Sequence, residues 1–123
     1  MTLAAAGAAV ALASALAAAP TVTLTAAGHN PKAGTRWLYS VKAEQGGKPA
    51  AAKLTAQIVD PIGGVHPVDY GTTTKPIKNW PFTGTFHDFV TWPKSSRGIP
   101  VTFRLTVTVG NVKKVIAYHV TPR

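Results

Sequence analysis

The chain has 123 residues and no cysteine, which excludes disulfide bonds, thiol catalysis and cysteine-ligated metal centres. Its 13 lysines and arginines outnumber its 4 aspartates and glutamates, and the resulting formal net charge of +9 favours anionic partners. The length is enough for one domain with a modest core and too short for two.

Residues 1–19 form an uncharged, alanine-rich stretch, and the first cation of the chain is Lys32. Secretory signals combine an apolar segment of about 7–15 residues with a small-x-small cleavage site, here Ala15-Leu16-Ala17. We therefore expect residues 1–19 to be a signal helix that directs the protein to a secreted or extracytoplasmic location. A retained N-terminal anchor and a helix packed against the domain are the alternatives, because a signal usually starts with a basic residue.

From residue 20 onward the sequence has the pattern of β-strands. Residues 21–25 alternate threonine with valine and leucine, which is the period of a half-buried strand. Residues 35–43 place aromatic and aliphatic side chains on one face of a second strand. The glycines at positions 46 and 47 predict a hairpin, and residues 54–58 supply the next inward face.

The second half of the chain contains one irregular and one very regular part. Residues 65–81 are interrupted by prolines and glycine, so we expect this segment to cross from one sheet to the other. The aromatic residues between 82 and 92 depart from strict alternation and predict a β-bulge. Residues 101–109 alternate strictly, and Gly110-Asn111 predicts a two-residue turn into a last strand over 112–120.

These strands recur at short spacing, and no segment after residue 20 has a helical period. The pattern predicts an all-β fold, an antiparallel β-sandwich of about seven strands. Two packed sheets are favoured over one open sheet, because an open sheet leaves one face of the large aromatic side chains in water. We expect Trp37, Phe86, Phe103 and Tyr118 in the core.

Several short segments resemble the immunoglobulin-like and fibronectin type III-like domains of exported bacterial proteins. They are Pro31-Lys-Ala-Gly34, Trp37-Leu-Tyr39-Ser-Val41, Gly47-Lys-Pro49 and the closing strand pair. The resemblance covers roughly Thr21 to Pro122 and implies one immunoglobulin-like domain over residues 20–123, preceded by the signal helix. It implies a spacer, adhesion or ligand-presenting role and no fixed chemistry. The antibody-type subfamily is excluded, because the chain lacks its cysteine pair.

We expect no catalytic site and no cofactor. None of Ser40, Ser95 and Ser96 lies in the Gly-x-Ser-x-Gly elbow of a hydrolase. Of the carboxylates that could form an acid–base pair, Glu44 and Asp60 occupy ordinary turn positions. These patterns predict a protein that is not an enzyme.

A metal site is a weaker alternative. Its ligands would be His66, Asp69 and His87, which are too widely spaced for the His-x-x-x-His signature of zinc proteins. Loop and surface histidines explain the same residues without a metal.

Exposed aromatic residues offer a second alternative, a carbohydrate-binding surface. Trp80, Tyr70 and Trp92 lie beside polar or irregular segments, where their rings could stack on sugars or anchor a partner chain. The competing interpretation places large aromatics such as Trp92 in the core of the sandwich.

The sequence thus predicts an exported, non-enzymatic immunoglobulin-like domain that acts as a binding or structural module at the cell envelope. Its expected partners are anionic cell-wall polymer, polysaccharide or a membrane surface. The cations are spread along the chain without alternating aromatics, so we expect no specific nucleic acid. The carbohydrate-binding accessory module and the metal-binding envelope protein are the alternatives, and the oligomeric state is left open.

Overall fold

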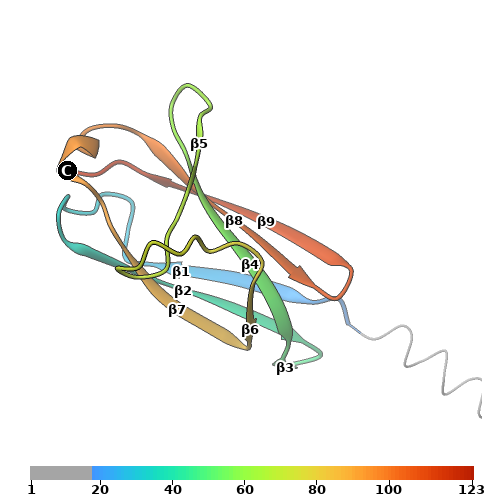
Figure 1. The fold of residues 1–123 in the computed structure, drawn as a ribbon. Helices are drawn as coiled ribbons and strands as arrows, with labels where there is room; N and C mark the ends of the chain where they lie inside the picture. The colour runs from blue at the N-terminus through green and yellow to red at the C-terminus, as the bar shows by residue number, and fades with distance from the viewer. Residues whose placement is uncertain (1–17) are drawn as a thin grey trace, which may run out of the picture.

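The computed structural model describes residues 18–123, which fold as two antiparallel β-sheets packed face to face (Figure 1). The predicted signal helix lies outside the described residues, except for its last two positions. In the part of the chain that is described, no helix has the length and hydrophobicity needed to cross a membrane.

The first sheet has four strands and is built around β2. Strands β1 and β7 pair with β2 along its length, and the short β3 pairs with its end. The strand bounds are Thr21–Ala26 for β1, Arg36–Gln45 for β2, Lys48–Pro49 for β3 and Thr85–Thr91 for β7.

The second sheet has five strands, in which β5 and β6 share one edge of β4 and β8 pairs with the other edge, followed by β9. The bounds are Ala51–Val59 for β4, Val65–Pro67 for β5, Trp80–Thr83 for β6, Val101–Val109 for β8 and Val112–Val120 for β9. A single 3-10 turn, η1 (Lys94–Ser96), connects β7 to β8. The prediction of an all-β, antiparallel two-sheet fold is confirmed, although two very short strands raise the count from about seven to nine.

The core lies between the sheets and is centred on Trp37 of β2. The Trp37 ring meets Trp92 and Phe103 edge-on, with ring centroids 5.6 Å and 5.2 Å away, and its indole N–H donates to the Gly28 carbonyl. Burying a side chain of this kind contributes roughly 1.5–3 kcal/mol. The expected core positions Trp37, Phe86 and Phe103 are confirmed as buried, and Tyr118 is half-buried against them.

Two continuous segments pass from one sheet to the other at a shared corner. The chain changes sheet at Ala50, between β3 and β4, and again at Gly84, between β6 and β7. Three backbone hydrogen bonds close the corner, from Ala43 to Gly84, from Ala50 to Ala43 and from Gly84 to Ala50. Gly84 has a φ of +78°, and a Cβ there would come within 3.1 Å of Pro49 Cβ, so glycine is required.

This corner corrects two predictions. We expected residues 65–81 to cross between the sheets, but β5 and β6 both belong to the five-stranded sheet, and the crossing comes later, at Gly84. The β-bulge predicted between residues 82 and 92 is also wrong for β7, because β7 pairs with β2 residue by residue from Thr85 to Thr91. The alternation breaks because the chain changes sheet at Gly84.

The two predicted hairpin turns are confirmed. Gly46 and Gly47 both have positive φ, as a type I′ turn requires, and Gln45 pairs with Lys48 across them. In the last hairpin only Gly110 has a positive φ, which fits a type II′ turn, and Val109 pairs with Val112.

Candidate binding surfaces

Tyr70 and Trp80, two of the aromatic residues proposed from the sequence, lie against each other. Their rings stack with centroids 4.8 Å apart and planes 18° apart. Tyr70 is 37% exposed, and Trp80 is half-buried against the core at the start of β6. The stacking covers one face of Trp80, so the accessible aromatic surface at this position belongs mainly to Tyr70.

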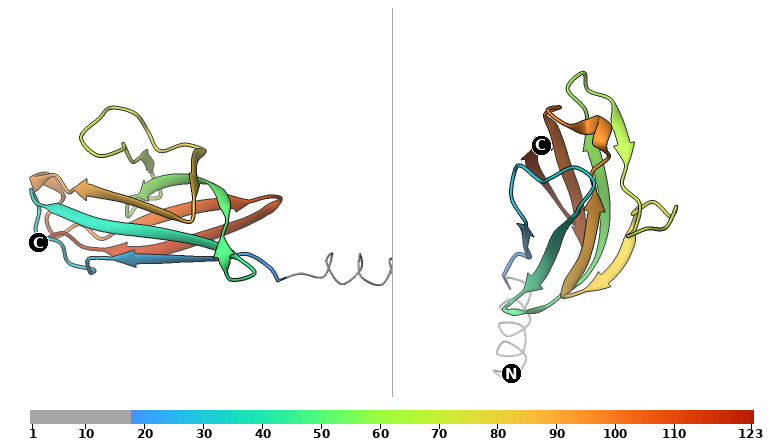
Figure 2. Two further views of the ribbon diagram at one scale, coloured as in Figure 1. Left: turned by 90° about the horizontal axis from the view of Figure 1, so that it is seen from below. Right: turned by 90° about the vertical axis from the view of Figure 1, so that its left-hand side faces the viewer.

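The loop that carries Tyr70, residues 68–76, is fixed to the four-stranded sheet by Asp88 of β7. The Gly71 N–H donates to both carboxylate oxygens of Asp88, at 3.1 and 3.3 Å, and the Tyr39 hydroxyl donates to one of them at 3.4 Å. Burial and the charge of Asp88 raise the pKa of the Tyr39 phenol well above its usual range. We refer to residues 68–76 as the Tyr70 loop; it projects from the edge of the sandwich (Figure 2).

Trp92, the third aromatic of that prediction, does not reach the surface. Its side chain is 2% exposed and packs on Trp37, and its carbonyl accepts a hydrogen bond from the Gly34 N–H. Its position between β7 and η1 buries it beneath the loop that precedes β2. Trp92 therefore belongs to the core, as the competing interpretation held.

The alternative metal ligands are not assembled. His66 points to Asp60 rather than to Asp69, and His87 lies on β7, whose pairing places it opposite Ser40. Among residues 18–123, no three His, Asp or Glu side chains are close enough together to hold a metal ion.

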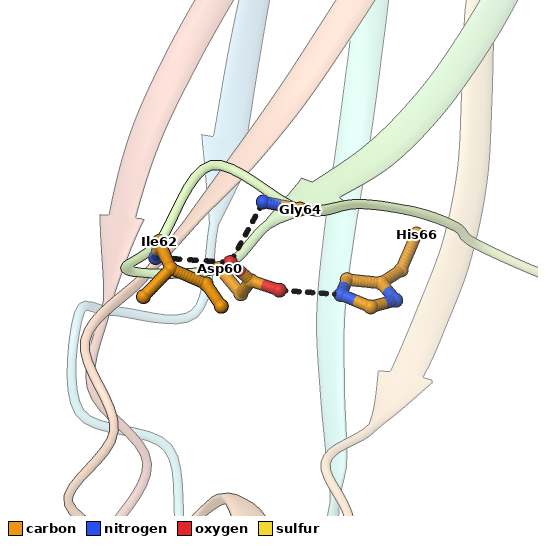
Figure 3. Close-up of polar contacts among 4 residues, drawn as sticks. All are labelled: Asp60, Ile62, Gly64 and His66. Carbon is orange, nitrogen blue, oxygen red and sulfur yellow. Dashed lines mark hydrogen bonds and ion pairs between the residues drawn. The ribbon is translucent and has the colours of Figure 1, made fainter.

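The contact between Asp60 and His66 stabilises the turn between β4 and β5 instead. One Asp60 oxygen accepts from the Ile62 and Gly64 N–H groups at 3.0 and 2.8 Å, and the other contacts His66 Nε2 at 2.8 Å (Figure 3). The His66 contact, followed by the Gly64 N–H, lowers the pKa of Asp60. This turn, residues 60–64, holds Ile62 at its tip with 94% of the side chain exposed.

The outer face of the five-stranded sheet carries a group of polar and basic side chains. Pairing of the strands aligns Lys53 of β4 with Thr108 of β8, and Thr108 with Lys113 of β9. The next row aligns Thr55 with Thr106, and Arg104 lies one further row along β8. We call this surface the basic face; its members are Lys53, Thr55, Arg104, Thr106, Thr108 and Lys113.

A shallow cleft of about 540 Å³ lies at one end of the basic face. Its lining is more apolar than polar: Lys53, Thr83 and Thr108 lie beside apolar residues that include Pro81 and Phe82. It lies where β6, β4 and β8 run side by side (Figure 1). The volume is in the range of small-molecule sites, although the cleft is open to solvent.

Sequence reasoning missed the basic face, because its cations are far apart along the chain. Lys53 and Lys113 are brought together only by the pairing of β4, β8 and β9. The signal that could have shown their common face is the alternation of residues 101–109, which turns Arg104, Thr106 and Thr108 outward.

No protein-family profile and no curated protein sequence matches the chain. Among solved structures, a DUF4466 family protein from Parabacteroides merdae is similar, with a TM-score of 0.48 and 15% sequence identity. The similarity covers 87% of this chain and 44% of that protein, so the chain spans less than half the length of that neighbour. The similarity assigns neither a family nor a function.

Proposed function

We propose that the protein is an exported, non-enzymatic immunoglobulin-like module that binds anionic polymer at the cell envelope. The observation that carries the proposal is the positive charge that the fold leaves without acidic partners. All 13 lysines and arginines lie within residues 18–123, and there only Lys42, 3.0 Å from Glu44, forms a salt bridge with a carboxylate.

Three of the four acidic residues already have partners within the molecule. Glu44 pairs with Lys42, Asp60 holds its own turn together with His66, and Asp88 holds the Tyr70 loop. The remaining cations therefore produce a surface potential that an external polyanion would neutralise. The alanine-rich residues 1–19 support an extracytoplasmic location for such a partner.

Salt-dependent retention tests the binding. The purified full chain is applied to immobilised dextran sulfate and to immobilised neutral dextran at increasing salt concentration. We expect retention on the anionic polymer alone, and its loss as added salt shortens the electrostatic reach to about 8 Å at physiological ionic strength. Retention that is equal on neutral dextran, or unaffected by salt, would rule out the proposal.

The N-terminus of the protein isolated from producing cells tests the export. A mature chain that begins after Ala17 or Ala19 in the extracytoplasmic fraction supports a cleaved signal. An intact Met1 in the cytosolic fraction would contradict it.

The Tyr70–Trp80 stack supports a second candidate, the binding of neutral sugars. A half-exposed aromatic ring on a fixed loop is suited to stacking on a sugar ring. A glycan array that compares the unchanged chain with Tyr70→Ala separates the two candidates. Binding of neutral glycans that is lost in Tyr70→Ala favours the sugar site. Binding of anionic glycans that Tyr70→Ala leaves unchanged favours the charge-based site.

A further inference from the structure

We infer that the basic face is the binding surface of the protein and that its ligand is a polyanionic polysaccharide. This inference rests on the proposed function and deepens it, because it names the surface and the class of polymer. It depends on where the fold places charge, hydroxyl groups and apolar groups.

The basic face presents cations at separations that suit a repeating polymer. Neighbouring strands lie about 4.8 Å apart, so the backbones of Lys53 and Lys113, with Thr108 between them, are separated by about 10 Å. Arg104 follows at four residues from Thr108 along β8, which corresponds to about 13 Å. Three positive groups are therefore spread over a flat area instead of converging on a single ion.

None of the four acidic residues occupies an outward position of the basic face. Glu44 is on β2 of the other sheet, Asp60 is at the turn after β4, Asp69 is in the Tyr70 loop and Asp88 is on β7. A polyanion approaching the basic face therefore meets only positive and neutral side chains, and the charges are complementary.

The threonines between the cations distinguish among polyanions. Thr55, Thr106 and Thr108 present hydroxyl groups, which donate and accept hydrogen bonds as sugar hydroxyls do. The cleft beside Lys53 places Thr83 and Thr108 around a space that a sugar ring can enter. A polysaccharide that carries anionic groups between hydroxyl-bearing sugar rings matches the row in which Thr108 lies between Lys53 and Lys113.

Two other polyanionic partners fit the surface less well. Binding of single-stranded nucleic acid relies on aromatic side chains on which bases stack. The outward positions of β8, from Thr102 to Thr108, are instead three threonines and one arginine. Peripheral membrane binding requires an extended apolar surface that enters the lipid. The exposed apolar side chains on β9 in these rows are Val115 and the small Ala117, which lie beside Lys113, Thr106 and Arg104.

Charge-matched variants of the full chain test the inference. The face variant is Lys53→Gln/Arg104→Gln/Lys113→Gln, and the control variant is Lys32→Gln/Lys75→Gln/Lys94→Gln, which removes three exposed loop and turn lysines. Both variants lower the net charge from +9 by three. Melting temperatures of both variants equal to that of the unchanged chain show that folding is preserved. If Arg104→Gln disturbs the sheet, the two triple variants are replaced by the double variants Lys53→Gln/Lys113→Gln and Lys32→Gln/Lys75→Gln.

Binding is measured at low salt to polygalacturonate, dextran sulfate, neutral dextran, a single-stranded oligonucleotide and phosphatidylglycerol vesicles. We expect the face variant to lose about tenfold in affinity for the two anionic polysaccharides and the control variant less than about twofold, since exposed charge contacts are individually weak. Polygalacturonate and dextran sulfate distinguish carboxylate from sulfate as the recognised group.

Three results would overturn the inference. Equal losses in the face and control variants would show that net charge alone determines binding, while leaving the proposed function intact. Tighter binding of the oligonucleotide or the vesicles than of both polysaccharides would assign the face to another partner. If the unchanged chain binds none of the anionic probes, the proposed function fails together with the inference.

Discussion

Two aspartates, Asp88 and Asp60, fix two loops through similar bonds but in different surroundings. Each carboxylate accepts from backbone N–H groups, Gly71 for Asp88, and Ile62 and Gly64 for Asp60. Asp88 also meets the buried Tyr39 hydroxyl and faces the core. Asp60 lies at an exposed turn and meets an exposed histidine.

The comparison shows that surroundings, rather than the number of bonds, determine what a carboxylate contributes to stability. Water can replace the partners of Asp60 as soon as the turn opens. Tyr39 is 3% exposed, so water replaces the partner of its hydroxyl only if the packing around the ring opens. We therefore expect changes at Asp88 to affect global unfolding and changes at Asp60 to affect only the turn.

Among changes at the two aspartates and their loops, Asp88→Ala is expected to have the largest effect. It leaves the Gly71 N–H and the Tyr39 hydroxyl without their partner, at a cost of about 2–3 kcal/mol in the free energy of unfolding. Denaturant unfolding measures the loss. Asp69→Ala, a change at an exposed position of the Tyr70 loop that Asp88 holds, is the control and should stay within about 0.5 kcal/mol. Equal losses in the two variants would show that Asp88 is not the anchor.

Tyr39→Phe should have a smaller effect, about 1 kcal/mol at neutral pH, because it removes one hydrogen bond and keeps the ring. It also changes the response to alkali. The pKa of Tyr39 is raised in the folded state, so above about pH 10 the unfolded chain loses a proton that the folded chain retains.

The stability of the unchanged protein should therefore fall as the pH rises above about 10, by up to about 1.4 kcal/mol per pH unit. In Tyr39→Phe, the free energy of unfolding should fall less steeply with pH, because the contribution from Tyr39 ionisation is absent. Denaturant unfolding of both proteins between pH 9 and 11 measures the difference. Parallel declines would mean that Tyr39 ionises in the folded state as easily as in the unfolded chain.

Asp60→Asn should affect the turn and leave global stability almost unchanged. We expect faster hydrogen exchange at the Ile62 and Gly64 amides, with a melting temperature within about 2 °C of the unchanged protein. Because the pKa of Asp60 is lowered in the folded state, its contribution is present above about pH 3.9 and is lost as the pH falls through the folded value. A large drop in the melting temperature of Asp60→Asn would show that Asp60, like Asp88, contributes to global stability.

Ile62→Ala should have the smallest effect. The side chain at the tip of this turn is 94% exposed, so its loss should change the free energy of unfolding by less than about 0.5 kcal/mol. The matched change Ile77→Ala, at a buried position with 1% exposure, should cost about 2–5 kcal/mol. A measurable loss at Ile62 would show that the tip contacts the rest of the protein.

Local patterns in the sequence predicted the strands well. The alternation over residues 101–109 and the turn at Gly110 both depend on neighbours within a few residues, and the structure confirms both. The inward side of β2 was predicted from the same kind of pattern, and Trp37 and Tyr39 are buried as expected.

Features that depend on distant segments were missed. The change of sheet at Gly84 is set by Pro49 and Ala50, more than thirty residues away in the chain. The polar neighbours of Trp92 suggested a surface position, whereas packing on Trp37 decides its burial. The inward position of Asp88 and the basic face likewise require the register between strands, which alternation within one strand does not contain.

The placement of the two ends of the described chain has a mechanical consequence. The start of β1 and the C-terminus lie at opposite ends of the sandwich (Figures 1 and 2). Tension between them would act along β1, whose ladder to β2 spans six residue pairs with hydrogen bonds perpendicular to the pull. Bonds loaded in shear share the force and break together, so a module held at one end and attached to polymer elsewhere should resist stretching instead of unzipping.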